Sequence, residues 1–163
     1  MKKPLSILPL LCGIGAIFLT MPAYSQTCEV NSVSNGTLIA SNFSQLLAND
    51  TVGIPGNINV SCSAGVTFTI TSITNNGTPS AINNVVDGVF AAIRSGTHTI
   101  ARGEVSPSAS IKPSHPPGIA GLIQTAPIID QDYAVDLSIF RTQSQFLPAG
   151  SYAYRVNILI TPQ

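Results

Sequence analysis

Most of the chain beyond residue 56 alternates between apolar and polar positions, the pattern of a β-strand with one buried face. Residues 57–62 place Ile58, Val60 and Cys62 on one face, and residues 66–70 repeat the pattern with threonines on the other. Further strands are predicted at residues 85–93, 98–102, 133–139 and 152–158, with Ile160 continuing the apolar face of the last one. Turn residues separate these segments at positions 75–77, 95–96 and 147–150.

The pattern predicts an all-β protein. About seven to nine short strands without βαβ rhythm favour an antiparallel immunoglobulin-like β-sandwich. The one helical prediction is a short turn over residues 43–48. Residues 107–127 hold five prolines and are expected to form a surface loop.

The first 25 residues have the features of a secretory signal peptide. Lys2 and Lys3 precede an apolar run over residues 5–19, and residues 23–25 (AYS) supply small residues for cleavage. We therefore expect a signal peptide at 1–25, one domain at 26–163, and export to the periplasm or cell surface. The apolar run is about 15 residues long, short of the roughly 20 that a spanning helix needs, so no membrane span is expected.

Two cysteines, Cys28 and Cys62, remain after this cleavage. An even number in an oxidising compartment predicts one disulfide between them, the alternative being two free buried thiols. The same 138 residues carry five basic and seven acidic side chains, a formal charge of −2, which argues against a nucleic-acid surface. Only 9% of the whole chain is charged, a composition typical of extracellular β-proteins with hydroxyl-rich faces.

The sequence holds no pattern that predicts catalysis, a cofactor or a metal site. His98 and His115 are isolated, and no motif pairs a nucleophile with a base or cradles a phosphate. Asp130, Asp132 and Asp136 superficially resemble a calcium loop, but Val135 and Arg141 occupy the positions of its glycine and closing glutamate. We interpret these aspartates as the solvated face of a strand and expect a protein that is not an enzyme.

Two stretches resemble the spore coat protein U-like domain family, which includes the archaic (Csu-type) chaperone-usher pilins. Residues 56–62 (GNINVSC), followed by the extended residues 66–70, are similar to the second-cysteine region of that family. Residues 148–152 (PAGSY) running into residues 156–161 resemble its final Gly-x-Tyr strand. Cys28 with residues 35–38 fits the first-cysteine region more loosely, and residues 78–132 offer no matching motif.

The resemblance implies a sandwich that lacks its last strand and leaves a hydrophobic groove beside the final one. In that family a periplasmic chaperone fills the groove with a strand, which a neighbouring subunit later replaces at the usher; this is β-strand addition. The apolar row of the groove would be Tyr152, Tyr154, Val156, Ile158 and Ile160. The same alternation would also arise from ordinary packing in a closed core.

The region before the first cysteine departs from polymerising pilins, which carry a donor segment there. Here only Gln26 and Thr27 would precede Cys28, so the chain is expected to accept a strand without donating one. The sequence thus favours a non-catalytic, terminal or accessory subunit of a pilus-like or coat-like assembly in adhesion. The alternative is a self-complete secreted β-sandwich that binds a ligand such as a glycan through the loops around His115 and Ser95-Gly96.

Overall fold

The computed structural model describes residues 26–77, 88–105, 121–125, 127–141, 146–147 and 149–163. Within these residues the chain forms β-strands and no helix, so the all-β prediction is confirmed. The strands are β1 (Cys28–Ser34), β2 (Ile39–Asn42), β3 (Gln45–Ala48), β4 (Gly56–Cys62), β5 (Val66–Asn75), β6 (Gly88–Ser95), β7 (His98–Val105), β8 (Ile128–Phe140) and β9 (Tyr154–Pro162).

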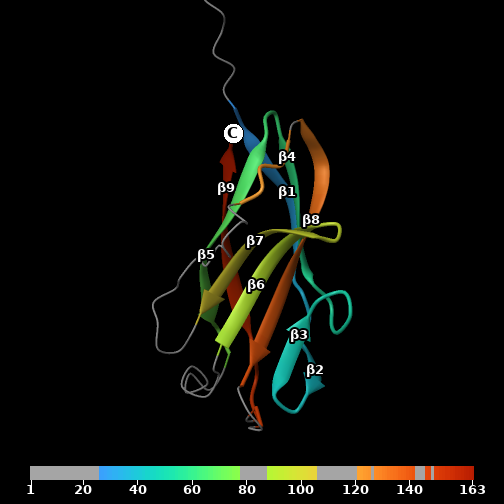
Figure 1. Ribbon diagram of the computed structural model, residues 1–163, viewed down its shortest axis with the longest axis vertical. Helices are drawn as coiled ribbons and strands as arrows, with labels where there is room; N and C mark the ends of the chain where they lie inside the picture. The colour runs from blue at the N-terminus through green and yellow to red at the C-terminus, as the bar shows by residue number, and fades with distance from the viewer. Residues whose placement is uncertain (1–25, 78–87, 106–120, 126, 142–145, 148) are drawn as a thin grey trace, which may run out of the picture.

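Seven of these strands form one antiparallel sheet organised around the long strand β8 (Figure 1). β6 pairs along one edge of β8, while β4 and β3 pair one after the other along its opposite edge. β1 extends the sheet beyond β4, β2 beyond β3, and β7 beyond β6. β1, β2 and β7 are therefore the outer strands of this sheet.

The remaining strands, β5 and β9, form a separate antiparallel pair that packs over the larger sheet. Val66, Phe68 and Ile70 of β5 are almost completely buried, and the Phe68 ring lies 4.5 Å from the Tyr133 ring of β8 between centroids. Ile58, Val60 and Cys62 of β4 are buried in the same core, as their alternation predicts. Removing these apolar faces from water is the main force that holds the two sheets together.

Cys28 and Cys62 form the predicted disulfide. The two residues lie directly opposite each other on β1 and β4, and such a pair shares one face of the sheet. Because Cys62 is buried, that shared face is the inner one. The bond fixes the start of β1 to the main sheet.

The helical turn expected over residues 43–48 is wrong, because this segment belongs to the β2–β3 hairpin. The side-chain oxygen of Asn42 accepts hydrogen bonds from the backbone N–H and the hydroxyl of Ser44, which forms a tight turn. β3 then pairs with β8 as well as with β2. The predicted signal peptide, residues 85–87 and most of the proline-rich segment lie outside the described residues.

Candidate functional site

The two packed sheets meet along two sides of the molecule. Residues 121–125 close the side between β5 and β7. The Leu122 N–H donates to the Ile100 carbonyl of β7 at 3.3 Å. Gln124 and Val66 of β5 exchange both backbone hydrogen bonds, at 2.9 and 3.0 Å. Backbone pairing is therefore continuous from β5 through this segment to β7.

The opposite side lies between β1 and β9, and it is not closed in this way. β9 pairs with β5 along one edge, and no strand in the described part of the chain pairs with its other edge. β1 likewise pairs only with β4 among the described strands. The two strands approach each other on this side of the molecule (Figure 1). Each presents a row of backbone N–H and C=O groups of the kind that can pair with another strand.

The apolar row of β9 borders this open side. Tyr154, Val156, Ile158 and Ile160 are half-buried and pack on the core, while the residues between them are exposed. Tyr152, just before the strand, is half-buried in the same cluster. The inward residues of β5 are at most 1% exposed over Val66–Ile70, whereas those of the β9 row are only half-buried. The structure thus brings together all five residues of the predicted row.

β1 presents a second apolar surface to the same side. Val30 lies opposite Val60, and Val33 lies opposite Ile58, which places both valines on the inner face of the sheet. Val60 and Ile58 are buried, yet Val30 and Val33 are 48% and 67% exposed. The inner face of β1 is therefore largely exposed at Val30 and Val33, although Cys28 at its start packs on the core.

A cavity of about 530 Å³ lies between these surfaces. Its apolar lining includes Val33, Leu38, Val135, Tyr154, Val156 and Ile158, and its one charged lining residue is Arg155. The volume falls within the range of about 300–1,000 Å³ that is usual for binding pockets. Burial raises the pKa of Tyr154 and of Tyr152 above the ordinary value of a phenol. We call this cavity, with the free edge of β9 and the inner face of β1, the β1–β9 groove.

The segment after β1 forms part of the groove wall and is tightly held. Thr37 and Ile54 exchange both backbone hydrogen bonds, at 2.7 and 3.0 Å. Ile54 belongs to the loop between β3 and β4. Gly36 lies so close to the end of this loop that a Cβ added to Gly36 would stand 2.6 Å from the Gly56 nitrogen. The wall therefore depends on the position of the loop between β3 and β4.

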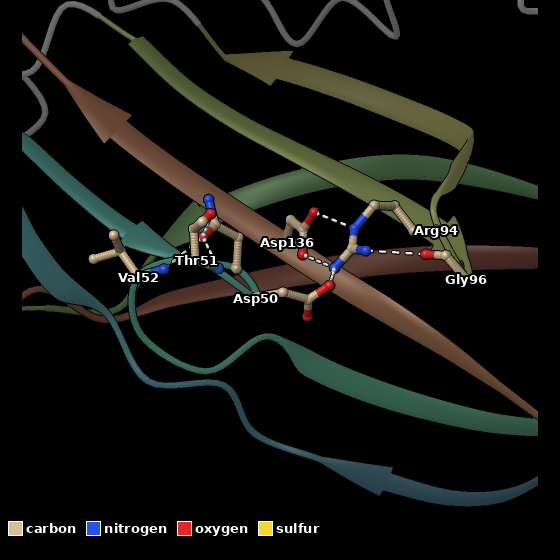
Figure 2. Close-up of polar contacts among 7 residues, drawn as sticks. Asp50, Thr51, Val52, Arg94, Gly96 and Asp136 are labelled. Carbon is tan, nitrogen blue, oxygen red and sulfur yellow. Dashed lines mark hydrogen bonds and ion pairs between the residues drawn. The ribbon is translucent and has the colours of Figure 1, made fainter.

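An arginine on the outer face of the main sheet holds that loop in place (Figure 2). The Arg94 guanidinium donates to both carboxylate oxygens of Asp136, at 2.5 and 2.9 Å, and its Nη2 lies 2.8 Å from Asp50 of the loop. It also donates to the Gly96 carbonyl at 3.0 Å. The hydrogen bond with Asp136 is the main cause of the raised pKa of Arg94. This cluster is internally satisfied and links β6, β8 and the loop.

The other polar candidates from the sequence do not gather into one site. Hydrogen bonds from Asn57 and Asn59 to Asp132 lower the pKa of its carboxyl group. Asp136 is instead paired with Arg94, and no group of three or more metal-ligating side chains occurs among the described residues. Ser95 ends β6 and Gly96 lies in the turn that leads to β7, and neither lines the groove; His115 lies outside the described residues.

Sequence reasoning missed Val30 and Val33 as groove residues. They are three positions apart, yet they share one face of the sheet because the register of β1 against β4 shifts between Val30 and Ser32. This irregularity breaks the period of two, so no alternation marks β1 in the sequence.

No protein-family model matches this chain, and no curated protein matches it either. Within the described residues, no helix is long and apolar enough to cross a membrane.

Proposed function

We propose that this chain is a non-catalytic, exported assembly subunit whose immunoglobulin-like sandwich lacks one strand. Its partners would be a periplasmic chaperone, an usher and neighbouring pilin-like subunits, one of which supplies the strand. The observation that carries the proposal is the free edge of β9, where a half-buried apolar row borders an open cavity. The resemblance of residues 56–62 and 148–161 to spore coat protein U-like domains supports the same function.

A strand entering the β1–β9 groove would gain two kinds of interaction. Its backbone would pair with the free edge of β9, and its alternate side chains would enter the cavity. Those side chains would cover Val30 and Val33 and complete the burial of the β9 row. Main-chain pairing would supply affinity, and the apolar pockets would supply the choice of partner.

The proposal is tested by extending the chain beyond Gln163 with a short Asn-Gly-containing linker and a nine-residue strand in which Val alternates with Thr. A matched extension carries Asn in place of each Val. We expect the Val/Thr extension to raise the thermal midpoint of the exported protein by about 5–15 °C, since it buries several apolar side chains. The Asn-substituted extension should leave the midpoint unchanged.

A different outcome would favour the second interpretation of the sequence. If the unextended protein melts cooperatively as a monomer and neither extension moves its midpoint, the sandwich is self-complete. The protein would then be a free-standing binder, and the assembly function would be wrong.

A further inference from the structure

We infer that the strand received beside β9 carries a carboxylate on its outward face, opposite Arg155. This inference rests on the proposed function and specifies the partner of the same groove. Arg155 lies on β9 between Tyr154 and Val156, which face the core, so its own side chain belongs to the outward face. It is exposed, and it is the one charged residue in β5 and β9 together.

Arg155 has no ion pair and no side-chain hydrogen bond within the described part of the chain. Its neighbour across the pair with β5 is Thr74, which cannot neutralise a guanidinium. Arg94, in contrast, is held by two carboxylates. Among the described strands, none pairs with the other edge of β9, and an added strand there would lie beside Arg155.

Cross-strand geometry makes this position effective. Residues directly opposite each other on paired strands have Cβ atoms about 5 Å apart, and opposite charges there stabilise the pairing. A carboxylate on the inward face would instead enter a cavity that offers no cationic side chain other than Arg155 at its rim. Burying an unpaired charge there is unfavourable. The carboxylate is therefore restricted to the outward face.

The two ends of the groove differ in charge. Glu29 follows Cys28 at the start of β1, and Cys28 is bonded to Cys62 near the β4–β5 turn. The C-terminal end of β9 lies at this same end, since the Gln163 N–H donates to the Gly65 carbonyl. Arg155 lies near the other end of β9, so a carboxylate on the incoming strand is favoured at that end of the groove.

The test uses the Val/Thr extension, with Glu, Gln or Lys placed in turn at each outward Thr position. In low salt, Glu at the position opposite Arg155 should give a thermal midpoint about 2–5 °C above that of Lys, with Gln between them. In the Arg155→Glu variant this order should reverse. The matched variant Arg102→Glu, which changes an exposed arginine on β7, should keep the original order. In 1 M NaCl the differences should shrink.

The outcomes separate this inference from the proposed function. Equal midpoints for Glu, Gln and Lys at every outward position, in extensions that all stabilise the protein, would overturn the inference alone. An order that persists in Arg155→Glu would also overturn it. If no extension stabilises the protein, the proposed function and this inference fail together.

Discussion

Replacement of Ile158 by Asp tests the groove directly, because the cost should depend on whether the groove is filled. Ile158 pairs with the buried Ile70 and lines the cavity, and its own side chain is half-buried. Full burial of an isoleucine side chain contributes about 1.5–3 kcal/mol, so about half of that is lost in the open groove. A partly desolvated carboxylate adds about 1–2 kcal/mol. We therefore expect Ile158→Asp to lower the free energy of unfolding by about 2–3 kcal/mol.

In the protein with the Val/Thr extension, Ile158 would be fully covered, and the same change should cost about 4–5 kcal/mol. Urea denaturation of both proteins measures the two costs. Asn157→Asp is the matched control, because Asn157 faces outward and its side chain donates to the Ser72 hydroxyl. A carboxylate there can accept a hydrogen bond from that hydroxyl, so the change should stay within about 0.5 kcal/mol.

Two results would refute this reasoning. An equal cost of Ile158→Asp with and without the extension would show that the added strand does not cover Ile158. Equal costs at positions 157 and 158 would show that the inward and outward faces of β9 are wrongly assigned.

Replacing both Cys28 and Cys62 by Ser should lower the free energy of unfolding by about 3–4 kcal/mol, since the bond joins residues 34 positions apart and restricts the unfolded chain; unchanged stability in urea would contradict this. Gly36→Ala should lower the thermal midpoint by several degrees because its Cβ would meet backbone at 2.6 Å, whereas Gly121→Ala, with its nearest contact at 3.4 Å, should be silent. Asp136→Asn removes the bidentate partner of Arg94, whose side chain is 14% exposed, and should lower the free energy of unfolding by about 1–3 kcal/mol in urea denaturation. Asp50→Asn, at an exposed carboxylate, should change that free energy by at most a few tenths of a kcal/mol. The pKa of Asp132 is lowered in the folded state, so ionised Asp132 stabilises the fold at neutral pH, and this stabilisation is lost as the pH falls through the lowered pKa. Asn57→Ala should raise the pKa of Asp132 in an NMR titration. An unchanged pKa would exclude the hydrogen bond from Asn57 as the cause.

Alternation predicted the strands whose inner faces are buried by the opposite sheet. In β4 and β5 the period of two coincides with complete burial of Val60 and Phe68, so local sequence and tertiary packing agree. The β2–β3 hairpin was missed because Leu46 and Leu47 are consecutive, and the turn at Asn42 rather than periodicity determines its conformation.

The groove was predictable only in part. The β9 row is visible in the sequence, but its apolar pattern is the same whether a neighbouring strand is present or absent. What distinguishes the two cases is the pairing of β1 with β4 and of β9 with β5, which joins residues far apart in the chain. The contact of Arg94 with Asp50 and Asp136, which positions the loop behind the groove wall, is equally long-range and has no local signal.

The pairing of β5 with β9 also has a mechanical consequence. The two strands are matched at nine positions, from Val66 opposite Pro162 to Asn75 opposite Tyr154. Hydrogen bonds in an antiparallel pair run perpendicular to the strands. A tension applied along a strand docked on β9 would therefore pull β9 lengthwise past β5 and load those pairs in shear, all at once. Such a joint resists pulling by sharing the force among its bonds, whereas a force across the strands would open them one after another from an end.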